Sequence, residues 1–168
     1  RFGSHCRVLA KGAAGDPRDL PGLCFAVLFS DTDAKQRAIA VFHDREAPTD
    51  ERILLLAALL HADPAQAVAA VGDRMRADQP ESSELLLAML GSLGRGQSPE
   101  IAKHVLDGYA RFEARVKPQA LDLLTSRAAW AHSLADAVAA KKIQPEEVNV
   151  NQIRKLASIN DDALRQRV

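Results

Sequence analysis

Apolar residues return every three or four positions along most of this chain, which is the spacing of one face of an α-helix. β-branched residues never form an alternating run, so the pattern predicts helices and no strands. Two clear stripes are Ala34, Ala38, Val41 and Phe42 in segment 31–42, and Ile101, Val105, Tyr109 and Phe112 in segment 99–112. Segment 23–30 is apolar on all sides, so we expect a buried helix that begins near Asp19.

Capping and turn residues divide this pattern into helices joined as hairpins. Asp63 can accept hydrogen bonds from the first turn of a helix, and Pro64 suits the first helical position. Ser98 and Pro99 repeat this arrangement, and Thr49 is the expected cap of an earlier helix. The sequence therefore predicts pairs of short helices separated by tight turns.

The C-terminal segment carries the same signals. A helix from about Asn149 has Gln152 in the position that completes a capping box. We expect Ile153, Leu156 and Ile159 to form its inward face, because they lie three residues apart.

Leucine clusters recur at a regular distance along the chain. Leu54–Leu56 recurs as Leu85–Leu87 about 31 residues later, and as Leu121–Leu124 about 36 residues after that. A helical hairpin repeated at this interval is typical of an α-solenoid, in which each hairpin buries its apolar face only by stacking on its neighbours. We therefore predict an all-α, right-handed, HEAT-like α-solenoid of about eight helices, as a single domain over residues 1–168.

The two ends of the chain indicate a fragment. Asn160, Asp161 and Asp162 can cap a helix of only six further residues, and so short a helix is unstable alone. The chain also opens with Arg1 and not with Met. We therefore expect a piece of a larger multidomain protein. The longest apolar run, Ile53–Leu60, is too short for a membrane span.

Charge is balanced overall, with 22 basic and 22 acidic residues. Residues 1–94 carry a net charge of −3 and residues 95–168 a net charge of +3, which is too weak a polarity for a nucleic-acid-binding stripe. Seven basic residues of the second half are either a solvated face or a docking patch for an acidic partner domain. They are Arg111, Arg115, Lys117, Lys141, Lys142, Arg154 and Lys155.

Residues that carry chemistry show no catalytic or metal-binding spacing. No two of the five histidines are four positions apart, as the H-E-x-x-H motif requires. The glycine-rich segment 91–96 follows a helix and lacks G-K-[ST], so it is a helix end and turn. His61 complements a helix C-terminus, and we expect His104 and His132 at surface or groove positions. We therefore expect no catalytic, cofactor-binding or metal-binding residues and no enzyme activity in this chain.

Trp130 and the two cysteines each have two interpretations. Trp130 either wedges between repeats or stacks on a ligand, and the first is the more common role of a lone tryptophan on an apolar stripe. Cys6 and Cys24 fit no zinc spacing. They are either small buried apolar side chains or, in an exported protein, a disulfide.

Two kinds of motif carry a family resemblance. The segments SDTDAKQRAIAVF and NDDALRQRV resemble the aspartate-then-arginine turn of HEAT repeats. Further features are Leu-Leu-x-x-Arg at 123–127, Trp130, the break at Ile143-x-Pro145, the helix from Gln152 to Leu156 and the Asp-rich start at 160–162. Together they resemble the helical region of large bacterial proteins described as PVC-type haem-binding CxxCH proteins or membrane-bound dehydrogenases. The resemblance covers roughly residues 50–168 and is strongest after 118.

In that family a HEAT-like array follows a β-propeller and precedes a cytochrome c domain. The resemblance thus implies a non-catalytic scaffold or interaction spacer next to a haem c domain, in a periplasmic or otherwise exported dehydrogenase. Its partners would be protein domains of the same chain or of a partner protein. No haem is expected here, because His5-Cys6 has the wrong order for C-x-x-C-H and no His stands directly after Cys24.

The alternative from another class is a HEAT-like DNA-binding enzyme of the alkylpurine glycosylase kind. Such an enzyme needs a basic concave face with several aromatic residues and a carboxylate. One Trp, one Tyr and zero net charge argue against this alternative.

Overall fold

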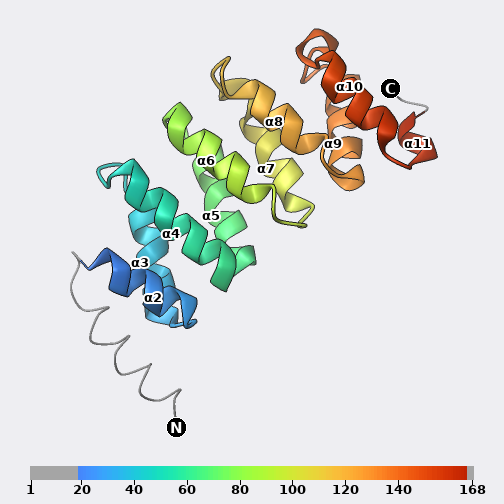
Figure 1. Ribbon diagram of the computed structural model, residues 1–168. Coiled ribbons are helices and arrows are strands. Elements are labelled where there is room, and N and C mark those ends of the chain that lie inside the picture. The colour runs from blue at the N-terminus through green and yellow to red at the C-terminus, as the bar shows by residue number, and fades with distance from the viewer. Residues whose placement is uncertain (1–18, 166–168) are drawn as a thin grey trace. The chain divides into compact units, whose positions relative to one another are not determined.

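The computed structural model of the protein describes residues 19–165, and every regular element in this range is helical (Figure 1). The α-helices are α2 (Leu20–Leu28), α3 (Thr32–His43), α4 (Thr49–Ala62), α5 (Pro64–Arg76), α6 (Ser83–Leu93), α7 (Glu100–Gly108), α8 (Lys117–Leu124), α9 (Ala128–Ala139), α10 (Val150–Ser158) and α11 (Asp162–Arg165). Two short 3-10 helices are η1 (Tyr109–Arg111) and η2 (Pro145–Glu147). The prediction of an all-α protein is confirmed for the described residues.

Side chains cap several helices where the sequence predicts caps. Oδ1 of Asp31 accepts from the backbone N of Ala34 at 2.9 Å, and Oδ1 of Asp63 accepts from that of Gln66 at 3.2 Å. These bonds satisfy N–H groups that have no partner within the helix. The prediction for Thr49 is wrong, because Thr49 is already the first residue of α4 and the proline before it makes no side-chain cap.

The chain divides into two compact units within α5, the first ending at Ala70 and the second beginning at Val71. In the first unit α2, α3 and α4 pack against one another. Ala34, Ala38 and Phe42 of α3 are completely buried, which confirms most of the stripe predicted there. The single-domain organisation stays a prediction.

Helix α2 is less buried than its all-apolar sequence predicts. Phe25, Leu28 and Phe29 are 42%, 45% and 52% exposed, so the expectation of burial on all sides is wrong. The rings of Phe25 and Phe29 instead lie 4.4 Å apart on the exposed face. Among the elements that the structure describes in this unit, α2 packs mainly against α3 and α4.

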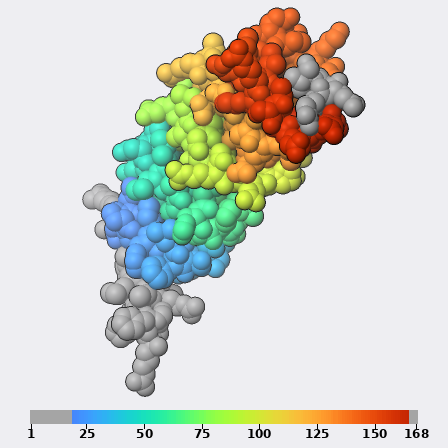
Figure 2. Space-filling view, turned by 45° about the vertical axis from the view of Figure 1, so that its right-hand side comes forward, coloured from blue at the N-terminus to red at the C-terminus, as the bar shows by residue number. Residues whose placement is uncertain are grey.

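In the second unit three helices pack against the helix two positions further along. Helix α6 lies beside α8, α7 beside α9, and α9 beside α11 (Figure 1). Figure 2 shows the red atoms of α10 and α11 next to the orange atoms of α9. Consecutive helices also meet, as α8 does with α9 and α10 with α11. None of the described helices has both the length and the apolar character needed to cross a membrane.

The contact between the end of α5 and α7 depends on a glycine. A Cβ added to Gly72 would lie 2.5 Å from Nδ1 of His104, so the imidazole fits only because residue 72 has no side chain. His104 is 8% exposed, and the prediction of a surface or groove position is wrong for it. The sequence does not reveal this burial, because the residues meet 32 positions apart.

Helix α10 begins as predicted but buries a narrower face. Asn149 and Gln152 form both bonds of the capping box, each at 3.0 Å. Leu156 is 6% exposed, whereas Ile153 on the same side of the helix is 41% exposed, so the predicted inward face is only partly buried at Ile153. Cys6 and the end of the chain after Arg165 lie outside the described residues.

Candidate functional site

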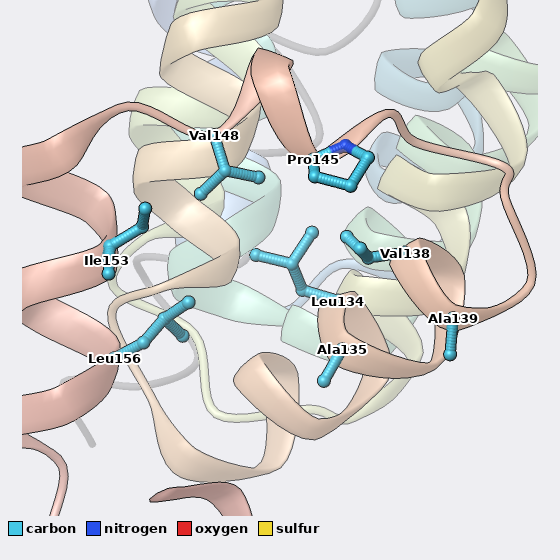
Figure 3. A pocket seen from close by; sticks show the side chains of 8 residues that line it. All are labelled: Leu134, Ala135, Val138, Ala139, Pro145, Val148, Ile153 and Leu156. Carbon is cyan, nitrogen blue, oxygen red and sulfur yellow. The ribbon is translucent and has the colours of Figure 1, made fainter. Parts of the chain in front are cut away.

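An apolar hollow of about 250 Å³ lies in the second unit between α9, η2 and α10 (Figure 3). Apolar side chains line it throughout: Leu134, Ala135, Val138, Ala139, Pro145, Val148, Ile153 and Leu156. Figure 3 shows Ile153 and Leu156 pointing from α10 toward Leu134 on α9, while Pro145 and Val148 lie on the connecting segment. We call this hollow the α9–α10 groove.

The end of α9 determines one rim of the groove. The backbone N of Lys141 donates to O of Val138, and that of Lys142 donates to O of Ala137, both at 2.9 Å. These two bonds close the helix around Lys141, whose φ of 59° is in the left-handed region. The chain then turns back toward Pro145, as Figure 3 shows, and Ile143 is buried within this turn.

Helix α10 forms the opposite wall and is held by α8. The amide Nε2 of Gln152 donates to the carbonyl O of Pro118 and to Oδ1 of Asp122, both at 3.2 Å. Nζ of Lys155 also lies 3.2 Å from Oδ1 of Asp122. Gln152 is completely buried, so these contacts and its role in the capping box fix the position of α10.

The seven basic residues predicted as a docking patch are spread over η1, the start of α8, the end of α9 and α10. Nη2 of Arg111 donates to the carbonyl O of Met75 at 2.8 Å. Nε of Arg115 lies 3.3 Å from a carboxylate oxygen of Glu113. These two residues and Lys155 therefore bond to neighbouring groups of the same chain.

Lys117 is also bonded, in a cluster that joins η1, α8 and η2. Its Nζ lies 2.8 Å from Oε2 of Glu147, and the phenol of Tyr109 donates to the same oxygen at 3.0 Å. The hydrogen bond from Lys117 lowers the pKa of Glu147, with further contributions from the backbone N of Gln144 and from Tyr109. Burial, and then the bond to Glu147, raise the pKa of Tyr109 well above its usual value. The cluster therefore joins η1, α8 and η2.

Three of the seven residues form no ion pair with other described residues: Lys141, Lys142 and Arg154. All three are exposed. Lys142 lines a second, more polar hollow of about 350 Å³ between α7 and α9, together with Lys103, Asp107 and Asp136. Lys141 follows the end of α9, and Arg154 follows Ile153 on α10.

His132 lies on α9 and is half-buried. Its Nε2 lies 2.8 Å from Oδ2 of Asp161. That bond, together with the bond from the backbone N of Leu164, lowers the pKa of Asp161. Asp161 thereby links α9 to the start of α11. Across residues 19–165, no group of three or more His, Cys, Asp or Glu side chains is placed to hold a metal ion.

Sequence reasoning identified the basic residues but missed the groove. The signal was present as an apolar residue at each end of the 143–148 connection and a stripe on α10 that continues past Leu156. Periodicity assigns such residues to the core, because it cannot show that α9 and α10 stand apart at this point.

Comparison of the chain with models of known protein families, with curated proteins and with solved structures finds no match.

Proposed function

We propose that this chain is a non-catalytic helical-repeat scaffold that binds and spaces protein domains. The observation that carries the proposal is the packing of α6 on α8, α7 on α9 and α9 on α11 in the second unit. Packing against the helix two positions along is what a HEAT-like α-solenoid requires, because each hairpin covers the apolar face of the next.

The polar contacts of the second unit favour the same function. Several of its buried side chains bond to other segments of the unit, as Gln152, His104 and Trp130 do. Such bonds position helices and provide no nucleophile or acid–base pair in a cleft. The lining of the α9–α10 groove is apolar, which suits the binding of another protein segment.

The wider context of the scaffold rests on the family resemblance of the last third. On that basis we propose a place in an exported dehydrogenase, beside a cytochrome c domain. Reading the coding sequence beyond Val168 tests this part of the proposal. A C-x-x-C-H motif there supports it, and a complete protein without that motif rules out the haem association.

Stepwise truncation tests the repeat architecture. A variant that ends at Lys142 lacks η2, α10 and α11. We expect its remaining helices to stay folded with a lower midpoint of thermal unfolding, because each layer stabilises only its neighbours. Complete loss of helicity by circular dichroism would instead indicate a closed bundle.

A DNA titration tests the glycosylase alternative. The scaffold proposal predicts no strong binding of a short duplex at any salt concentration. Submicromolar affinity that falls steeply with added salt would favour the DNA-binding enzyme.

A further inference from the structure

We propose that His104 closes an acid-sensitive contact between α7 and the last residues of α5. We call residues 71–76 the α5 end. The chain divides into its two units between Ala70 and Val71, so the α5 end continues directly from the first unit. Opening the contact would therefore loosen the segment that connects the two units. The proposal concerns the fold alone and does not depend on the scaffold function.

The contact fits closely because a glycine lies where the imidazole meets α5. A Cβ added to Gly72 would lie 2.5 Å from Nδ1 of His104 and 2.6 Å from Cε1. The histidine is 8% exposed, so its ring is largely removed from water. A ring packed this closely against a helix has little room to turn its Nδ1 away from α5.

Arg76 makes the contact depend on the charge of the ring. Its Nη1 lies 2.8 Å from Nδ1 of His104, and its Nη2 donates to Oδ1 of Asp73 at 2.8 Å. Because a guanidinium has only donors, Nδ1 must accept, and it can accept only while the ring is neutral. A protonated ring would place a second donor against Arg76 and bring two positive charges together.

The other charged groups around the ring do not remove this effect. Burial, and then the charge of Arg76, lower the pKa of His104. On α7 itself, Lys103 adds to the lowering, while Glu100 and Asp107 oppose it without reversing it. Below about pH 6.5 a ring released into water therefore binds a proton that the closed contact resists, and acid favours the open state.

Contacts that do not involve His104 also hold the α5 end. Nη2 of Arg111 donates to the carbonyl O of Met75 at 2.8 Å, and a Cβ added to Gly108 would lie 3.1 Å from the same oxygen. Arg74 forms an ion pair with Glu81. Acid should therefore increase the population of the open state without releasing the α5 end completely.

Native-state hydrogen exchange of the whole chain tests the proposal. Protection of the α5 end and of α8 is measured at pH 7.5 and at pH 5.5, after correction for the intrinsic exchange rate of each amide. We expect the α5 end to lose protection about fivefold or more at pH 5.5, the change that a tenfold difference in proton affinity between the two states gives. Its exchange should stay faster than that of α8 and insensitive to low concentrations of urea, because a local opening exposes little surface.

Substitutions identify the group that responds to acid. His104→Asn keeps an acceptor for Arg76 but does not titrate, so the acid effect at the α5 end should disappear. Arg76→Gln should reduce the effect, since an amide can donate to the neutral ring or accept from the charged ring. The side chain of Arg76 is 40% exposed, so this variant should fold even if the first does not. The matched control is His132→Asn on α9, which should leave the effect unchanged.

Two outcomes would overturn the inference. Equal exchange rates and equal urea dependence of the α5 end and α8 at both pH values would show that the α5 end opens only when the whole second unit unfolds. A loss of protection that both His104→Asn and Arg76→Gln leave unchanged would assign the acid response to another group. Neither outcome bears on the scaffold proposal, which the truncation variant tests separately.

Discussion

Nη1 of Arg76 lies 2.8 Å from Nδ1 of His104 across the interface of α5 and α7. A guanidinium has only donors, so Nδ1 must accept and the proton of the neutral ring lies on Nε2. Burial, and then the charge of Arg76, lower the pKa of His104. Lys103 adds to this effect, and Glu100 and Asp107 oppose it. The neutral imidazole is therefore the form that this interface holds.

The first prediction concerns the pH dependence of stability. Below about pH 6.5 the unfolded chain binds a proton at His104 that the folded chain resists, so the free energy of unfolding decreases as pH falls. The stability that the neutral imidazole contributes should be fully present above that pH. Urea unfolding at pH 7.5 and at pH 5.5 measures the difference. His104→Asn should reduce the difference.

Two glycine substitutions should have opposite effects. A Cβ at Gly72 would lie 2.5 Å from the ring of His104, so Gly72→Ala should destabilise the protein by about 1–3 kcal/mol. A Cβ at Gly91 in α6 meets nothing within 4 Å, so Gly91→Ala should stabilise by about 0.5–1 kcal/mol through helix propensity. Chemical denaturation compares the two. Equal effects would refute the packing of His104 on Gly72.

Trp130 should contribute through both its volume and its hydrogen bond. It is 1% exposed, and its Nε1 donates to the carbonyl O of Ser98 at 3.1 Å. Trp130→Ala should cost about 3–5 kcal/mol. Trp130→Phe keeps most of the volume but leaves the carbonyl without its donor, and should cost about 1–3 kcal/mol. Both are measured by circular dichroism in urea, because Trp130 is the only tryptophan and its fluorescence is lost.

A final pair of variants separates local from tertiary roles of Gln152. Glutamate at this position preserves the capping box with Asn149, so local rules predict little change. The buried amide also donates to Pro118 and Asp122, and a carboxylate would lose both bonds and repel Asp122. We therefore expect Gln152→Glu to destabilise by more than about 2 kcal/mol at pH 7. It should destabilise at least as much as Gln152→Ala.

Acid should partly rescue Gln152→Glu, since a protonated carboxyl can donate as the amide does. The stability gap between the glutamate variant and the wild-type protein should therefore narrow as pH falls below about 5. A gap that stays constant with pH, or that is absent at pH 7, would contradict the buried bonding of Gln152.

The sequence by itself determined the helical class and most helix starts. Asp31, Asp63 and Asn149 accept from N–H groups three residues away, so their effect is encoded locally. The sequence also determined which face of α3 is buried, because the helical period of its apolar residues identifies a single face. It failed at Thr49, where a proline already occupies the position before the helix.

Only the tertiary structure decided which faces find a partner. The exposed side of α2, the burial of His104 against Gly72 and the partial exposure of Ile153 depend on residues far away in the sequence. The ion pairs of Lys117 and Lys155 likewise join segments about 30 positions apart. The physical reason is that burial and ion pairing depend on which surfaces of the folded chain contact each other. A local sequence pattern specifies only which surfaces are suitable for such contacts.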